Sequence, residues 1–217
     1  MLSTVSTPSS PPAARLGLFG GTFDPWHRGH ELVLTRVAAS GLVDEILVVP
    51  AAQPPHKTLP LTPFGQRLAM VTAALASRPR VRALDIEVRL PPPSYTLHTV
   101  RQLLSSLRPH SLALILGADG FLDLHRWHAA AELLAQVELL VLTRPPWTGA
   151  ELAQQEQRLR ALGIHPQPAI HCLAGEELAL SSSEVRRRLA AGDDPAGLVP
   201  PPVADYIRRH GLYGASR

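Results

Sequence analysis

Residues 16–30 read LGLFGGTFDPWHRGH, and the rest of the chain can be interpreted outward from them. The first four residues are mostly apolar and predict a short buried strand. We expect this strand to end at Gly20 and Gly21, because a backbone without Cβ atoms can turn tightly or lie close to a ligand. The stretch therefore predicts a strand followed by a glycine turn.

The next residues are typical of the beginning of a helix. Thr22 and Asp24 carry oxygens that can cap backbone N–H groups, and Pro25 is compatible with a first helical position. Residues 31–39 continue with a helical pattern, for which Gly41 supplies a C-terminal stop. Because free N–H groups and the positive dipole end of a helix attract anions, this order of elements is that of a phosphate site.

The expected beginning of the helix contains two histidines, His27 and His30. His27 and His30 share one face of a helical turn, and both can donate to phosphate oxygens. The stretch has neither the GxxxxGK[ST] pattern of a P-loop nor a complete GxGxxG motif. A structural metal or simple solvation of the pair stay open as alternatives. His125 and His128 form a second HxxH, interpreted as helix-surface histidines because no further ligand has a familiar spacing.

The length of 217 residues suits one domain with a substantial core. We expect residues 1–14 to be a disordered tail, since they carry no charge and lack the segments of a secretory signal. Residues 15–217 are expected to form the domain. No apolar run approaches the roughly 18 residues of a membrane span, which predicts a soluble protein. The single cysteine, Cys172, favours a reducing cytoplasm.

The charge pattern speaks against a nucleic-acid partner. The formal net charge is +3 and the pI is near 9.6, but the arginines are scattered over the whole chain. A nucleic-acid binder would show a dense basic arm or a platform of aromatic and basic residues. The balance suits an enzyme that acts on anionic metabolites.

Dense apolar runs alternate with helical patterns along the chain. This alternation predicts an α/β fold with a single doubly wound, Rossmann-like parallel sheet and helices on both faces. Strands are expected at residues 16–19, 45–49, 81–88, 111–116, 138–143 and 168–173. Helices are expected at residues 31–39, 62–76, 97–107, 149–162 and 203–213. Ligands bind such sheets at the carboxyl ends of the strands.

Lys57 is the only lysine among 21 basic residues. It ends a proline-rich loop, residues 50–57, together with His56. A lysine at a carboxyl edge is a mobile point charge that can follow phosphates as they change position during transfer. Chance composition and a solvated loop are the alternatives.

Further polar residues follow the later strands. Ser94 is an N-cap candidate for the next helix. After the strand at 111–116, Gly117 and Asp119 repeat the order of glycine and acid, so a backbone turn would place a carboxylate at the edge of the sheet. Trp127 offers a flat face on which an aromatic ring can stack, or it is a core residue.

Residues 180–186 read LSSSEVR. Serines at a helix N-terminus offer hydroxyls and free N–H groups, and Arg186 brings a planar fork of donors one turn later. The alternative is a serine-capped amphipathic helix with exposed arginines. Arg187 and Arg188 are expected to be solvated.

These motifs resemble a known family. GGTFDPWHRGH is similar to the GGTFDPxHxGH signature of bacterial nicotinate-nucleotide adenylyltransferases, a branch of the HxGH nucleotidyltransferase superfamily. The PPHK, SYT and GxDxxxxLxxW elements of the family follow in order, and then an ISSTxIR-like element. That last element departs mildly from the pattern at Leu180, Ser183 and Val185. The resemblance covers residues 20–186, about three quarters of the chain.

The resemblance implies transfer of the adenylyl group of ATP to nicotinate mononucleotide, which yields nicotinate adenine dinucleotide and pyrophosphate in NAD biosynthesis. Mg²⁺ would be carried with ATP, and no metal site of the protein itself is expected. Phosphopantetheine adenylyltransferase is the alternative, because it shares HxGH and a late Ser-Ser-x-x-x-Arg element. It lacks the PPHK, SYT and LxxW elements. In a non-catalytic nucleotide sensor, we would expect one or both histidines of the HxGH element to be replaced, and both His27 and His30 are present.

By resemblance, each motif residue takes a role. The catalytic residues are His27, His30, Lys57 and Arg186. The ATP-binding residues are Gly20, Gly21, Thr22, Phe23, His27, His30, Ser182 and Arg186. The residues for nicotinate mononucleotide are Lys57, Thr96, Asp119 and Trp127. The partners are these small molecules, with no nucleic acid or membrane. The oligomeric state and the preference for nicotinate over nicotinamide mononucleotide stay open.

Overall fold

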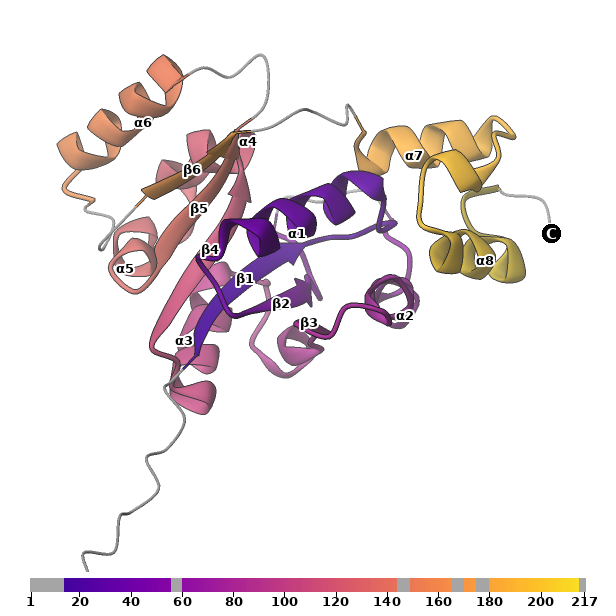
Figure 1. The fold of residues 1–217 in the computed structure, drawn as a ribbon, viewed down its shortest axis with the longest axis horizontal. Coiled ribbons are helices and arrows are strands. Elements are labelled where there is room, and N and C mark those ends of the chain that lie inside the picture. Colours follow the sequence, from indigo (N-terminus) through magenta and orange to yellow (C-terminus); the bar gives the residue numbers. More distant parts are fainter. Residues whose placement is uncertain (1–13, 56–59, 144–148, 165–169, 175–179, 215–217) are drawn as a thin grey trace, which may run out of the picture.

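The computed structural model describes residues 14–55, 60–143, 149–164, 170–174 and 180–214. Within these ranges, a six-stranded parallel sheet has the order β3-β2-β1-β4-β5-β6 (Figure 1). This is the strand order of the doubly wound dinucleotide-binding fold. The predicted fold class is therefore confirmed. Apart from Ala14, the predicted tail lies outside the described residues.

The strands are β1 (Arg15–Gly21), β2 (Glu45–Pro50), β3 (Val81–Ala83), β4 (Ser111–Gly117), β5 (Glu138–Thr143) and β6 (Ile170–Ala174). The α-helices are α1 (Arg28–Ser40), α2 (Phe64–Leu75), α3 (Thr96–Leu107), α4 (Ala118–Asp123), α5 (Ala130–Leu134), α6 (Gly149–Ala161), α7 (Ser182–Ala190) and α8 (Pro201–His210). The 3-10 helices are η1 (Ile86–Arg89), η2 (Leu124–Arg126), η3 (Pro195–Gly197) and η4 (Leu212–Gly214).

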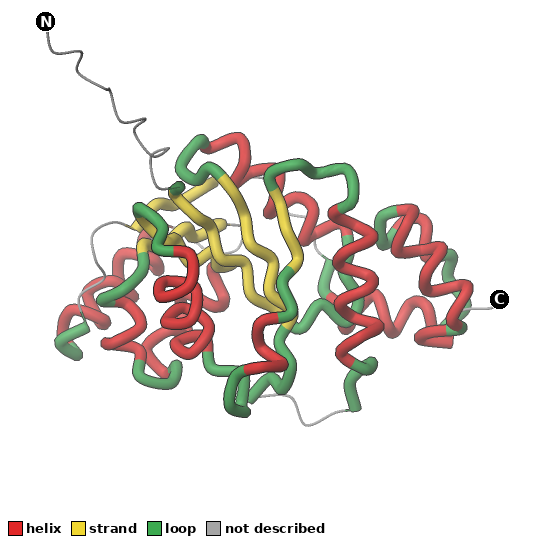
Figure 2. Tube along the Cα trace, turned by 90° about the horizontal axis from the view of Figure 1, so that it is seen from below, coloured by secondary structure: helices red, strands yellow, loops and turns green. Residues whose placement is uncertain are grey.

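Alternate residues of the strands pack into two apolar cores, one on each face of the sheet. Phe19 of β1 joins the core that contains Leu34 of α1 and Val185 of α7. Its neighbour Leu18 joins the core that contains Leu97 of α3. In Figure 2, the yellow strands accordingly run between red helices. Burial on both faces explains why these strands read as nearly continuous apolar runs in the sequence.

β1 lies at the centre of the sheet, where the strand order reverses. Leu18 pairs with Leu47 of β2 on one side and with Leu114 of β4 on the other. After β1 the chain connects to strands on one side of the sheet, and after β4 it connects to strands on the other side. A crevice therefore opens beyond the carboxyl ends of β1 and β4. Helices α7 and α8 lie beyond the same end of β1 (Figure 1).

The predicted strand at residues 81–88 is wrong in its second half. β3 ends at Ala83, and the chain turns into η1. This turn carries Glu87 inward, where its carboxylate accepts hydrogen bonds from Thr99 Oγ1 at 2.8 Å and from Ala52 N at 3.2 Å. Because a buried carboxylate without partners is costly, these two donors favour the turn over an extended chain.

Ser94 does not cap helix α3. Tyr95 occupies the N-cap position and makes no side-chain capping bond. The Ser94 hydroxyl accepts instead from Gln53 N at 2.9 Å, and Ser94 N donates to Gln53 O at 2.9 Å. These two bonds fasten the loop after β2 to the beginning of α3. The end of that loop, with His56 and Lys57, lies outside the described residues.

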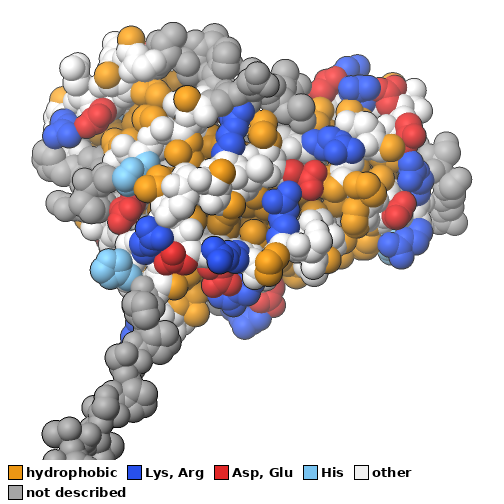
Figure 3. Space-filling model, viewed as in Figure 1, with side chains coloured by type: hydrophobic (Ala, Val, Ile, Leu, Met, Phe, Trp, Pro, Cys, Tyr) orange, Lys and Arg blue, Asp and Glu red, His pale blue; other side chains and the backbone are white. Residues whose placement is uncertain are grey.

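The outer surface carries mixed charge. On the face seen in Figure 3, basic and acidic side chains are interspersed, most densely over α7 and α8. Arg187 and Arg188 are solvated, as the sequence predicts, with side chains 69% and 44% exposed, and they pair on the surface with Glu184 and Asp193 at 2.6 Å each. In the part of the chain that the structure describes, no helix combines the length and the apolar character needed to cross a bilayer.

Candidate active site

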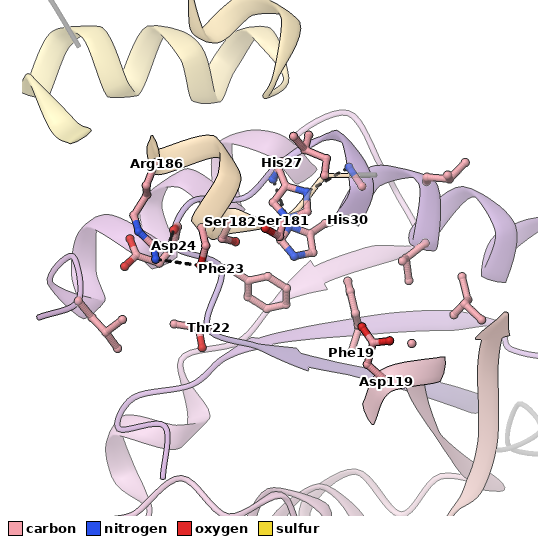
Figure 4. A pocket seen from close by; sticks show the side chains of 18 of the residues that line it. Phe19, Thr22, Phe23, Asp24, His27, His30, Asp119, Ser181, Ser182 and Arg186 are labelled. Atoms are coloured by element: carbon pink, nitrogen blue, oxygen red, sulfur yellow. Dashed lines mark hydrogen bonds between the residues drawn. The ribbon is translucent and has the colours of Figure 1, made fainter. Parts of the chain in front are cut away.

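A cavity of about 510 Å³ lies at the carboxyl ends of β1, β4 and β5. Gly117 and Thr143 contribute from the ends of β4 and β5, and Phe19 contributes from β1. The other walls come from the β1–α1 loop, from α1 and from the beginning of α7 (Figure 4). The cavity therefore occupies the position where doubly wound sheets bind ligands.

His27 is the N-cap of α1, so the expectation that Thr22 and Asp24 would cap this helix is wrong. His27 Nδ1 accepts a hydrogen bond from Gly29 N at 3.1 Å. In return, His30 Nδ1 accepts from His27 N at 3.1 Å, which completes a reciprocal capping box. Pro25 does not start the helix either, because α1 begins three residues later, at Arg28.

The capping bonds define the protonation of both imidazoles. Since Nδ1 of His27 and of His30 accepts a hydrogen bond, the neutral rings carry their proton on Nε2. Burial lowers the pKa of His27 to about 4. Burial, together with the neighbouring His27 ring, lowers the pKa of His30 well below its usual range. Near neutral pH, the pair therefore presents two N–H donors without positive charge.

Aromatic rings hold these imidazoles in place. His27 and His30 stack with ring centroids 3.7 Å apart. Phe23, Trp26 and Phe19 surround His30 at centroid distances of 4.9, 5.0 and 6.0 Å. Trp26 is completely buried. The position of His30 is thus set by packing as well as by its hydrogen bond.

The beginning of α7 closes the cavity on the side of the β1–α1 loop. Ser181 is the N-cap, and its hydroxyl accepts from Glu184 N at 3.1 Å. Ser182 Oγ donates to Pro25 O at 3.0 Å. Arg186 Nη1 donates to Asp24 O at 2.6 Å (Figure 4). The serine-capped helix and the convergence with the first motif are therefore both observed.

The structure brings most of the predicted phosphate residues to one cavity. The predicted residues that line it are Thr22, Phe23, His27, His30, Asp119, Ser182 and Arg186. Gly20 and Gly21 lie at the end of β1 and do not line it. A Cβ at Gly21 would lie 2.7 Å from the Phe23 ring, whereas Gly20 faces open space. Gly21 is thus needed for the close packing of the loop itself.

Two residues predicted for the pyridine ring lie outside this cavity. Thr96 begins α3, and Trp127 is half-buried against the second core. Their segments meet where the exposed His128 ring stacks on Tyr95 at 4.0 Å. Asp119 lines the cavity of the histidines instead. The proposed contacts to the mononucleotide are therefore divided between two places.

The second HxxH is not a pair on one helix surface. His125 lies in η2, where its Nδ1 is 3.0 Å from Leu122 O, and His128 lies in the turn that follows. Neither ring lines the cavity. Within the described ranges, no group of three His, Cys, Asp or Glu residues could hold a metal ion.

Sequence reasoning missed several residues at the site. Arg36 of α1 and Leu180 line the cavity. Helical periodicity could have found Arg36, because positions 29, 33 and 36 fall on one face of α1. Asp24 was expected to cap a helix, but its carboxylate accepts from Tyr213 Oη at 2.6 Å. No local pattern reveals a contact between residues so far apart in the sequence.

Comparisons with known proteins agree with this arrangement. The cytidylyltransferase-like family model matches residues 18–188. The "Probable nicotinate-nucleotide adenylyltransferase" of Aeromonas salmonicida is 40% identical over 211 residues, which cover 93% of this chain and 98% of the relative. The protein of the same name from Symbiobacterium thermophilum is 38% identical over 201 residues, which cover 92% and 95%.

Solved structures share the fold. The nicotinic acid mononucleotide adenylyltransferase of Plasmodium falciparum, complexed with NaAD, superposes with a TM-score of 0.76 at 21% identity. The superposition covers 93% of this chain and 98% of the other. The family model and the relatives each extend over most of the chain, including the histidine pair and Arg186. The chain therefore belongs to the cytidylyltransferase-like family and, within it, to the nicotinate-nucleotide adenylyltransferases.

Proposed function

We propose that this enzyme transfers the adenylyl group of ATP to nicotinate mononucleotide, giving nicotinate adenine dinucleotide and pyrophosphate in NAD biosynthesis. The observation that carries the proposal is the neutral pair His27 and His30. Their two Nε2–H donors lie at the carboxyl edge of the sheet, in one cavity with the beginning of α7. Such a site favours a polyphosphate because donors and a helix N-terminus converge on it.

The chemistry needs positioning more than acid–base catalysis. An oxygen of the mononucleotide 5′-phosphate attacks the α-phosphorus of ATP, and the bond from that phosphorus to the bridging oxygen breaks as pyrophosphate leaves. A phosphate monoester has a second pKa of about 6, so the attacking oxygen is already anionic near neutral pH. The enzyme has to align two anions and stabilise the charge that shifts to pyrophosphate.

The proposed roles of the residues follow from where their donors lie. His27 and His30 donate from Nε2 to the ATP phosphates. Arg186 lines the same cavity from α7, and its guanidinium offers further donors besides those that reach Asp24 O and Ser183 Oγ. Ser182 holds the beginning of α7 against the loop and, by resemblance, contacts the triphosphate.

The remaining roles rest on the family resemblance. Thr96 and Trp127 would face the nicotinate ring, and Asp119 would orient a ribose. Lys57 would lie near the transferring phosphates. Gly20, with open space where its Cβ would be, leaves room for a nucleotide beside the end of β1.

A divalent metal belongs to this chemistry, because proteins of this family use it with ATP. We propose that the ion is Mg²⁺ and that it enters bound to the triphosphate. Mg²⁺ keeps several of its own waters and binds substrate phosphates with few protein ligands.

The test is pyrophosphate release with Mg-ATP and each of three acceptors: nicotinate mononucleotide, nicotinamide mononucleotide and phosphopantetheine. We expect the highest kcat/KM with nicotinate mononucleotide and formation of nicotinate adenine dinucleotide. A preference for phosphopantetheine would overturn the assignment in favour of coenzyme A biosynthesis. No release with any of the three would overturn the enzyme activity itself.

A further inference from the structure

The loop that connects the glycine turn to His27 has an unusual backbone. Phe23 lies in the left-handed region with φ 49°, although it is a bulky, buried residue. Such a conformation persists only where the surroundings impose it. The Phe23 ring packs over Gly21 and meets the His30 ring edge-on at 4.9 Å. The conformation of this loop therefore helps to determine where His30 lies.

The residue after Phe23 is held from the other end of the chain. Asp24 is only 2% exposed, and its Oδ1 accepts from Tyr213 Oη at 2.6 Å. Its Oδ2 accepts from Thr62 N at 3.2 Å. Tyr213 also lies in the left-handed region, with φ 57°. The hydrogen bond between Asp24 and Tyr213 therefore has a strained residue on each side. Phe23 directly precedes Asp24, and Tyr213 is itself strained.

The tyrosine hydroxyl is oriented toward the carboxylate. Thr62 Oγ1 donates to Tyr213 Oη at 3.1 Å, which leaves the tyrosine proton for Asp24. Burial, with the hydrogen bond to Asp24, raises the pKa of Tyr213 well above its usual range. The hydroxyl therefore keeps its proton near neutral pH and donates it to Asp24.

Two arginines hold the same loop through its main chain. Arg67 is 1% exposed, and its Nη1 donates to Thr22 O at 2.7 Å. Arg186 donates to Asp24 O at 2.6 Å. The loop is thus held from α2, α7 and η4. The arginines of α2 and α7 bond to its main chain, whereas Tyr213 of η4 bonds to the Asp24 side chain and does not line the cavity.

We propose that Tyr213 is a positioning residue for adenylyl transfer. By donating to Asp24, it keeps residues 22–25 in the conformation in which Phe23 supports His30 at the ATP phosphates. Tyr213 does not line the cavity, so it acts through Asp24 and not on the substrate. The inference rests on the proposed function, because its effect is measured in that reaction.

The primary variant is Tyr213→Phe, which removes one hydroxyl and keeps the ring. We expect KM for Mg-ATP to rise by at least about fivefold, while KM for nicotinate mononucleotide stays within about twofold of the original value. A purely structural role would lower the fraction of active enzyme, which reduces kcat and leaves both KM values unchanged. The division between the two substrates therefore separates positioning from folding.

Tyr206→Phe is the matched control. Tyr206 lies on α8, its ring contacts His210 at 4.2 Å, and its hydroxyl makes no hydrogen bond with the described residues. We expect this variant to keep the original kinetics with both substrates. An equal loss in Tyr206→Phe would overturn the proposal, because it would show a general sensitivity of the C-terminal segment.

A double-variant cycle tests the route through Asp24. If Tyr213 acts through that carboxylate, the losses of activity in Tyr213→Phe and Asp24→Asn do not add. The double variant is then as active as the less active of the two single variants. Additive losses would overturn the route. Should Tyr213→Phe not fold, Thr62→Val decides, since it removes the donor that orients the tyrosine. Unchanged ATP kinetics in Thr62→Val would then reject the proposal.

The two hypotheses fail in different ways. An original enzyme that releases no pyrophosphate from Mg-ATP and nicotinate mononucleotide overturns the proposed function. An active original enzyme, together with a Tyr213→Phe variant of unchanged ATP kinetics, overturns only the role of Tyr213.

Discussion

At the scale of single side chains, we propose that His30 is a catalytic donor because of how it is held. Its Nδ1 is occupied by the backbone of His27, and three aromatic rings surround it, so Nε2 is its only free polar atom. A donor of this kind stabilises charge best when it is already in position before the reaction begins.

We expect His30→Ala to lower kcat at least about tenfold, which corresponds to roughly 1.4 kcal/mol of transition-state stabilisation. The reason is the loss of a positioned donor to the phosphates of ATP. Steady-state turnover with Mg-ATP and nicotinate mononucleotide measures the effect, and circular dichroism checks the fold. A folded variant that turns over at the original rate would exclude His30 from the mechanism.

The lowered pKa of His27 predicts a dependence of stability on pH. The folded protein binds this proton only near pH 4, whereas an unfolded histidine binds it near 6.5. As the pH falls from 6.5 to 4, the unfolded state therefore takes up this proton first. The free energy of unfolding decreases by about 3 kcal/mol over that range, because the buried His27 stays neutral in the folded state. Above pH 6.5, His27 is neutral in both states, and none of this stability is lost.

His27→Gln isolates this contribution. Its amide oxygen can still accept a hydrogen bond, but it does not titrate. Urea unfolding at several pH values between 4 and 7 should show that the variant loses less stability than the original protein on acidification. Parallel curves for the two proteins would mean that His27 titrates normally in the folded state.

Helix α1 depends on the glycine between its two histidines. A Cβ at Gly29 would lie 2.9 Å from the His27 ring and 3.4 Å from Leu180 O. The ring must therefore move if any side chain is added, and with it the donor that faces the cavity. The glycine in the HxGH element is required by packing within the protein.

Gly29→Ala should reduce kcat at least about tenfold, since small displacements of catalytic groups are costly in rate. Gly65→Ala is its control, because a Cβ at that exposed position of α2 meets no atom within 4 Å. We expect the control to keep full activity and to gain up to about 1 kcal/mol of stability from the better helix propensity of alanine. Equal activity in both variants would contradict the packing argument.

Local sequence patterns predicted the elements around the site, but not how those elements are held. Glycines after an apolar run gave β1 and α1 correctly, since strand, turn and helix depend on neighbouring residues. The N-cap was wrong because cap propensity favours Thr22 and Asp24, while the actual cap, His27, depends on its own ring geometry. The contacts of Arg67 and Tyr213 were missed because they join distant segments.

At the scale of the whole molecule, the metal requirement can be tested by measuring activity and melting temperature with and without EDTA. Chelation with EDTA should abolish pyrophosphate release, and added Mg²⁺ should restore it, if Mg²⁺ enters bound to ATP as proposed. Without ATP, EDTA should leave the melting temperature unchanged, since the described residues include no metal-ligand group and only ligands bound to the folded state raise stability. A lower melting temperature after chelation would reveal a resident ion.

The hydrogen bond between Asp24 and Tyr213 joins residues 189 positions apart, so the loop before His27 gains this contact only when the end of the chain has been synthesised. Domains generally fold as units, and β1 with its glycine turn leaves the ribosome long before residue 213. Its loop is nevertheless fastened by a residue translated long after the sheet. A chain that ends before residue 213 would thus contain both histidines but lack the hydroxyl that donates to the Asp24 side chain.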